Sequence, residues 1–144
     1  MKTRWMALAA GAMMLAACSK APSIDDAWVR LPAVPGRPAV AYATITGGSV
    51  DVELTTVSTP AARRVELHRS MTGGHGMATM QPLQRLPVAK DRTVQLAPGG
   101  IHAMLFDPAP NLQPGGWIKL TFDFDGSEQT VDARLVGAGD PAPE

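Results

Sequence analysis

The sequence predicts an all-β domain, a sandwich or Greek-key barrel of about nine short strands. The chain has 13 prolines and 14 glycines spread over 144 residues, and they interrupt any long regular element. Apolar runs with a helical period are few, whereas short runs with alternating polarity recur. The length and the 45% hydrophobic content suit one globular domain.

The first expected strands lie on either side of a proline-rich connector. Residues 27–31 and 40–46 have the composition of strands, and the fixed φ angles of proline exclude regular pairing across 32–38. After a short glycine loop, residues 50–58 form the third expected strand, in which Val50, Val52 and Leu54 share one face.

The middle of the chain alternates between short strands and glycine-rich turns. Pro60 ends the third strand, and in the next, 64–68, Val65 and Leu67 are expected to face inward. His68 is then expected at a strand end, on its polar side. A glycine-rich loop at 72–76 follows, and the next strands are expected at residues 77–83, 93–96 and 101–106.

The last expected element is a β-hairpin. Apolar residues alternate with polar ones over 118–124 and again over 130–135. Between them, Asp125-Gly126 is a strong signal for a tight turn. The domain is therefore expected to end near residue 136, and residues 137–144 are expected to form a flexible tail.

The N-terminus is typical of a bacterial lipoprotein. Residues 1–17 combine Lys2 and Arg4 with a short apolar run, which indicates an export signal too short to span a bilayer. The run ends in Leu-Ala-Ala-Cys, which resembles a lipobox, so we expect Cys18 to be lipidated and residues 18–26 to form a tether before a domain at 27–136. The alternative is cleavage after an Ala-x-Ala-like site beside an incidental cysteine.

The net charge argues against a nucleic-acid-binding protein, and the cysteine content argues against a disulfide-stabilised domain. Removal of residues 1–17 takes away Lys2 and Arg4 from the 13 basic residues and nothing from the 13 acidic ones. The resulting charge near −2 gives no support for binding nucleic acid. Cys18 is the single cysteine, so the domain has no internal disulfide and must be held together by its core.

Histidine and methionine are clustered. Beyond residue 18, all of them lie between positions 68 and 104: His68, Met71, His75, Met77, Met80, His102 and Met104. Imidazole and thioether suit a soft ion such as Cu(I), whereas Mg²⁺ or Ca²⁺ would need clustered carboxylates. The cluster therefore predicts a copper site.

Strand geometry selects among these residues. His102 and Met104 are two apart on an expected strand, so both leave the same face while Ala103 points to the core. His68 and Met80 flank a loop and can bring two further ligands to the same edge. Taken singly, a strand-end histidine is more often solvated and a methionine more often fills a core.

The spacing of these four residues resembles the motif of the periplasmic copper chaperone family PCu(A)C. The intervals are twelve residues from His68 to Met80, twenty-two to His102 and two to Met104. The similarity extends over about residues 25–136, through segments at 27–30, 60–68, 99–102 and 112–116. It departs at Arg69, where some members have a further methionine, and at the C-terminus, which lacks the His- and Met-rich tail of some members.

The resemblance implies a cupredoxin-like fold that holds one Cu(I) per chain with His68, Met80, His102 and Met104. It further implies a monomeric periplasmic chaperone, not an enzyme, that delivers copper for the copper centre of cytochrome c oxidase. Its partners would be the oxidase subunit carrying that centre or a Sco-type thiol chaperone. The residue after Cys18 is Ser19 and not the aspartate typical of lipoproteins retained in the inner membrane, which favours an outer-membrane anchor.

Alternatives remain open at this point. Met71, His75 and Met77 are possible auxiliary ligands or a docking lip, or they merely belong to a mobile loop. The chain could sequester copper for tolerance and deliver it to no partner, because both functions need the same ligands. A metal-free adhesive domain is a third possibility. A blue-copper protein is disfavoured because no cysteine is available to the site, and a hydrolase because no hydrolase motif occurs.

Overall fold

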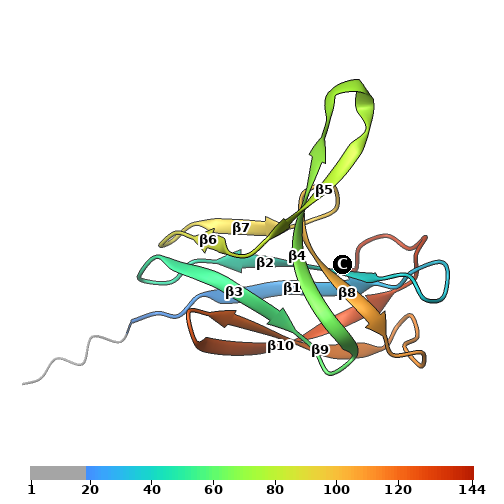
Figure 1. The fold of residues 1–144 in the computed structure, drawn as a ribbon. Coiled ribbons are helices and arrows are strands. Elements are labelled where there is room, and N and C mark those ends of the chain that lie inside the picture. The colour runs from blue at the N-terminus through green and yellow to red at the C-terminus, as the bar shows by residue number, and fades with distance from the viewer. Residues whose placement is uncertain (1–18) are drawn as a thin grey trace, which may run out of the picture.

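A computed structural model describes residues 19–144, which form ten strands and one short 3-10 helix (Figure 1). The predicted signal peptide and Cys18 lie outside the described residues. In the described part of the chain, no helix is long and apolar enough to cross a membrane. The elements are β1 (Ser23–Arg30), β2 (Ala39–Thr46), β3 (Val52–Ser58), β4 (Ala62–Thr72), η1 (Gly74–Gly76), β5 (Ala78–Leu83), β6 (Leu86–Val88), β7 (Thr93–Leu96), β8 (Ile101–Pro108), β9 (Trp117–Phe124) and β10 (Ser127–Val136).

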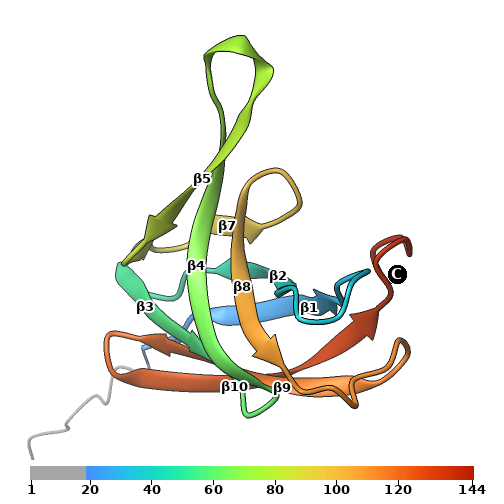
Figure 2. The same ribbon diagram turned by 45° about the vertical axis from the view of Figure 1, so that its right-hand side comes forward.

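All ten strands belong to one sheet, in the order β5-β4-β8-β7-β2-β1-β10-β9-β3-β6, with a further pairing of β8 to β2. The sheet curls so far that β3 lies against β4 (Figures 1 and 2). It does not close by hydrogen bonds, because β5 and β6 are its edges. The predicted all-β class is confirmed, with ten strands where about nine were expected.

The core is built by alternation along the strands, most regularly in β9. Ile118, Leu120, Phe122 and Phe124 of β9 are buried, as the hairpin pattern predicts. The turn at Asp125 and Gly126 has positive φ at both residues (52° and 92°), the conformation that favours Asp-Gly in tight hairpins. Other fully buried side chains come from opposite parts of the sheet: Val29, Ile45, Leu54, Val88 and Leu105. One core therefore holds the curled sheet together.

Two strands extend well beyond the bounds predicted from the sequence. β1 begins at Ser23, inside the expected tether. A bulge between Asp25 and Trp28 interrupts the alternation of side chains, and β1 pairs with β2 on both sides of this bulge. β4 continues to Thr72, well past His68. In the expected tail, the carbonyl of Asp140 accepts a hydrogen bond from Arg30 at 3.0 Å. Pairing and tertiary contacts, which local sequence does not report, set these ends.

The β4–β5 hairpin projects from the sheet as an arm, defined here as residues 70–80 (Figures 1 and 2). The backbone N–H of Ser70 donates to the carbonyl of Gly100 at 3.0 Å, which is where β4 leaves β8. Beyond that point β4 pairs only with β5. The glycine-rich tip forms η1 and is closed by a hydrogen bond from Gly73 N–H to the Met77 carbonyl. Thr72, which was predicted to belong to the loop, is therefore part of a paired strand.

Candidate metal centre

The outer face of β4 and β8 gathers most of the predicted ligands. His68 pairs directly with His102, and Glu66 pairs with Met104. Side chains of directly opposed residues leave the same face of a sheet with Cβ atoms roughly 5 Å apart. Ala103 and Leu105 point the other way and are fully buried in the core. The expectation that His102 and Met104 share a face opposite Ala103 is confirmed.

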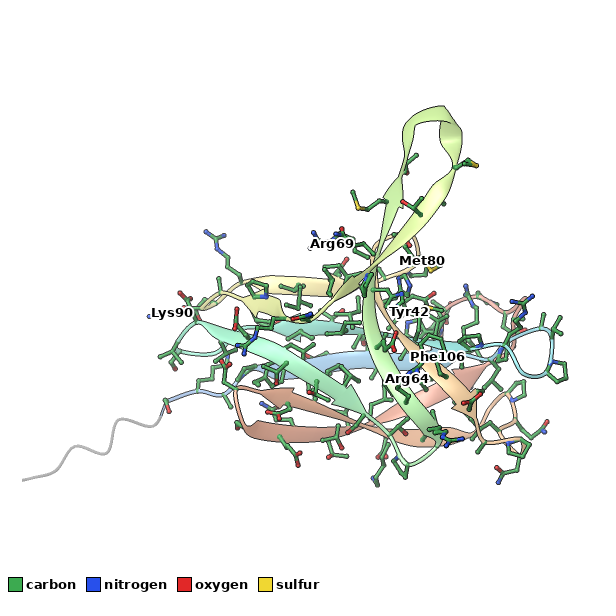
Figure 3. The ribbon with its side chains drawn as sticks, viewed as in Figure 1. Tyr42, Arg64, Arg69, Met80, Lys90 and Phe106 are labelled. Carbon is green, nitrogen blue, oxygen red and sulfur yellow. The ribbon has the colours of Figure 1, made fainter. Side chains whose placement is uncertain are left out.

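Met80 reaches this face from β5. It pairs with Ser70, and Pro82 pairs with His68, so Met80 is the diagonal neighbour of His68 on the same side of the sheet. Diagonal neighbours lie roughly 7–8 Å apart, which a long side chain can bridge. Figure 3 shows Met80 at the base of the arm, where the hairpin joins the body. The structure therefore brings His68, Met80, His102 and Met104 to one face, although His68 lies within β4 and not at a strand end as expected.

His102 has a defined proton position. Its side chain is almost completely buried, with the whole residue 4% exposed. Nδ1 lies 3.0 Å from the carbonyl oxygen of Gly100, which can only accept a hydrogen bond, so Nδ1 carries the proton. In the neutral ring, the lone pair is then on Nε2. His102 can bind a metal through Nε2.

His68 has the opposite arrangement. Its Nε2 lies 3.1 Å from a carboxylate oxygen of Glu66, which accepts a hydrogen bond, so Nε2–H is the donor. Its Nδ1 is buried and has no hydrogen-bond partner. An unpartnered buried polar atom costs free energy, and a metal ion is one way to satisfy a buried imidazole lone pair. This orphaned nitrogen fits a metal site on the face.

The two imidazole rings are close enough for one ion to bind both, and thioethers lie beside them. The two ring centroids are 6.1 Å apart. Metal–nitrogen bonds of about 2 Å allow two imidazoles on one ion to have centroids up to roughly 6.5 Å apart when the ion lies between them, so a four-coordinate ion would bring the two rings somewhat closer together. Among residues 19–144, no three His, Cys, Asp or Glu side chains are placed to hold a metal together. The thioethers of Met80 and Met104 lie on the same face as the two histidines, and thioethers are donors that suit Cu(I).

Two neighbours of the site were missed by sequence reasoning. Glu66 contacts His68, and the signal was available, because residues two apart on a strand share a face. Tyr42 was not detectable locally, since only the pairing of β2 with β8, in which Ala41 opposes Ala103, carries it toward the strand of His102. Its ring stacks on Trp28 with centroids 4.4 Å apart. Burial raises the pKa of Tyr42 above its ordinary value, although the charge of Arg30 lowers it in part.

The three possible auxiliary residues lie on the arm and not on this face. Met71 pairs with Thr79 and so projects from the side of the ribbon opposite to Ser70 and Met80. Met71 is 48% exposed and Met77, next to the tip, is 71% exposed. His75 lies in η1 at the tip. The structure does not bring these residues together with His68 and His102.

Comparisons with known proteins give a family and a fold. The model of the LpqE-like family, whose description is that of a lipoprotein, matches residues 23–135. No curated protein sequence matches the chain closely. The solved structure of the copper-bound PCuAC domain from PmoF2 is similar to this chain, with a TM-score of 0.67 and 23% identity over 83% of this chain and 95% of that one.

One protein from Deinococcus radiodurans, DR1885, has a similar structure in two forms. The Cu(I) form of DR1885 has a TM-score of 0.58 and 24% identity, over 85% of this chain and 81% of that one. Its apo form has a TM-score of 0.55 and 26% identity, over 95% and 97% of the two chains. The expected cupredoxin-like fold, as found in PCuAC domains, is therefore confirmed.

Proposed function

The chain belongs to the LpqE-like family, and we propose that it is a copper chaperone that carries one Cu(I) ion on His68, Met80, His102 and Met104. The observation that carries the proposal is the direct pairing of His68 with His102, with an unpartnered buried nitrogen on His68 and two thioethers on the same face. Solved structures of similar fold include copper-bound and Cu(I) forms, which supports the choice of ion.

The histidines and the methionines have different roles in holding and releasing the ion. The histidines lie in the body of the domain, where backbone and side-chain hydrogen bonds orient their rings. Thioethers are neutral and cannot form disulfides, so they remain competent in an oxidising compartment where free thiols would be lost. They are also weaker donors than thiolates, which favours transfer by ligand exchange.

Met80 favours delivery over storage. It is 59% exposed at the base of the arm, so an incoming donor atom can replace it without unfolding the sheet. A protein that only sequestered copper would gain by burying all four ligands. We therefore propose delivery, with the copper centre of cytochrome c oxidase or a Sco-type thiol chaperone as the receiving partner, and a monomer as the working form.

The family description names a lipoprotein, and we propose that Cys18 carries the lipid and holds the domain at a membrane facing the periplasm, with the outer membrane favoured. Several acyl chains anchor a protein stably where one is marginal. Replacement of Cys18 by Ser should abolish incorporation of a palmitate analogue in the native host. Labelling that persists in this variant would contradict the assignment.

The test of the function is an anaerobic titration of the mature protein with Cu(I), in competition with a chromogenic chelator. We expect one tight equivalent, which is lost in the His68→Ala/His102→Ala double variant. Cu(II) should bind more weakly, without an intense blue colour, because no thiolate is present to give that band. A wild-type protein that bound no Cu(I) would exclude the chaperone and the sequestering protein together.

Delivery needs a separate test in cells. Under copper limitation, a strain without this protein should lose cytochrome c oxidase activity, and added copper should restore it. Copper sensitivity with normal oxidase activity would instead favour sequestration. The His68→Ala/His102→Ala variant is the control, because it should fail to complement although the core faces of its strands are unchanged.

A further inference from the structure

We propose that Glu66, held by Arg64, is a positioning residue that orients His68 so that His68 binds Cu(I) through Nδ1 while His102 binds through Nε2. This inference rests on the proposed function and adds a residue outside the four ligands. It also assigns a different metal-binding ring nitrogen to each histidine. The inference follows from the hydrogen-bond partners of the two rings, the Glu66 carboxylate and the Gly100 carbonyl, because each of these groups can only accept a hydrogen bond.

The partner of His102 is a backbone carbonyl. Gly100 O can only accept, so it selects the tautomer with the proton on Nδ1. Because Gly100 also accepts the N–H of Ser70, the same carbonyl ties the ring to the point where the arm leaves β8. The nitrogen left for the metal is Nε2.

The partner of His68 is a side chain on its own strand. Glu66 lies two residues earlier on the same face of β4, and its Oε2 is 3.1 Å from Nε2 of His68. The carboxylate accepts from Nε2–H and leaves Nδ1 with a lone pair. That nitrogen is buried without a hydrogen-bond partner, so its lone pair is available to bind a metal ion.

Glu66 is itself held in place. Its other oxygen, Oε1, is 2.9 Å from Nε of Arg64. The Arg64 guanidinium lies over the ring of Phe106 at 4.3 Å from the ring centroid. Figure 3 shows Arg64 and Phe106 together, below Met80 on the same side of the body. Residues 64, 66 and 68 thus form a chain of contacts along one face of β4 that ends at the metal site.

A carboxylate in this position has two effects on a histidine ligand. It fixes the tautomer and the orientation of the ring, and it increases the basicity of the nitrogen that faces the metal. Loss of such a partner typically weakens metal affinity by about 10–100-fold. An ordinary surface ion pair has no such effect, which makes the inference testable.

The chain offers a matched control. Glu53 pairs with Arg85 at 2.7 Å and its side chain is 40% exposed, against 38% for Glu66. It lies on β3 and contacts no histidine among the described hydrogen bonds. Glu53→Ala therefore removes a carboxylate of similar exposure and pairing without touching the site.

The experiment compares wild type, Glu66→Ala, Glu66→Gln and Glu53→Ala. Nitrogen-15 NMR of the metal-free imidazoles should show Nδ1 of His68 and Nε2 of His102 unprotonated in the wild type. The Nε2 proton of His68 should be protected from exchange with water, and this protection should be lost in Glu66→Ala. Chelator competition should show a 10–100-fold loss of Cu(I) affinity in Glu66→Ala, partial recovery in Glu66→Gln, which keeps an acceptor oxygen, and no change in Glu53→Ala.

Two results would overturn the inference while the proposed function stands: a wild-type His68 protonated on Nδ1, or Glu66→Ala binding Cu(I) as tightly as Glu53→Ala. If Glu66→Ala does not fold, the wild-type NMR and the comparison of Glu66→Gln with Glu53→Ala still decide the question. If wild type binds no Cu(I), the proposed function fails, and the NMR result, which is obtained without metal, still tests separately whether Glu66 sets the tautomer of His68.

Discussion

The arm and the body of the domain present their donor atoms in different ways. In the body, β8 pairs with β4 on one side and with β7 and β2 on the other, so His102 and Met104 are held at buried or partly buried positions. Beyond the hydrogen bond from Ser70 to Gly100 at its base, the arm pairs only with itself, and its methionines, Met71, Met77 and Met80, are all exposed. The difference separates two requirements of a chaperone. A rigid sheet sets the ligand geometry, and an accessible edge lets the ion enter and leave.

Disruption of the core below the ligands should have the largest effect. Leu105 is fully buried between Met104 and Phe106 on β8, so Leu105→Ala should cost about 2–5 kcal/mol of unfolding free energy. Met71→Ala on the arm is the comparison and should change it by less than about 0.5 kcal/mol. Urea denaturation of both metal-free variants measures this. Similar losses in the two variants would mean that the arm supports the fold as much as β8 does.

Removal of a body ligand should come next. His102→Ala should weaken Cu(I) binding about 100-fold or more, equivalent to about 2.8 kcal/mol. His75→Ala, at the tip of the arm, should change the affinity less than about threefold, or about 0.6 kcal/mol. Competition with a Cu(I) chelator gives both values. Equal losses would contradict the assignment of His102 as a ligand and of His75 as peripheral.

The sequence predicted the parts of this arrangement that depend on alternation within one strand. The hairpin of β9 and β10 and the shared face of His102 and Met104 follow from a period of two residues. Glu66 was predictable as a neighbour of His68 for the same reason. What alternation cannot supply is register between strands distant in sequence. The direct opposition of His68 and His102, 34 positions apart, needed the fold itself.

Two further differences have specific causes. β6 was missed because it has three residues and contains Pro87, which is tolerated there because β6 is an edge strand. The extension of β4 beyond His68 was missed because the glycines of 73–76 suggested that the whole segment was a loop. Pairing of Met71 with Thr79 and of Thr72 with Ala78 instead carries the strand to the tip.

Met80 joins the two regions, and its loss should have an intermediate effect. Met80→Leu keeps a side chain of similar volume and removes the sulfur, so the fold should be unaffected. We expect Cu(I) affinity to fall about tenfold, or about 1.4 kcal/mol, through faster release. Stopped-flow transfer to a chelator measures the release rate. Met104→Leu, in the body, is the matched comparison, and an unchanged rate in Met80→Leu would remove Met80 from the ligand set.

The smallest equilibrium effect is expected at the outer part of the arm. Met71 projects from the side opposite to His68 and Met77 lies exposed next to the tip of the arm, so Met71→Leu/Met77→Leu should change Cu(I) affinity less than about twofold, or about 0.4 kcal/mol. Leucine keeps the apolar surface of both positions and removes only the thioethers. If these exposed sulfurs capture Cu(I) before it reaches the site, the double variant should load copper more slowly at unchanged affinity. Stopped-flow loading measures this, and a second tight Cu(I) equivalent that disappears in the variant would instead make Met71 and Met77 ligands of a separate site.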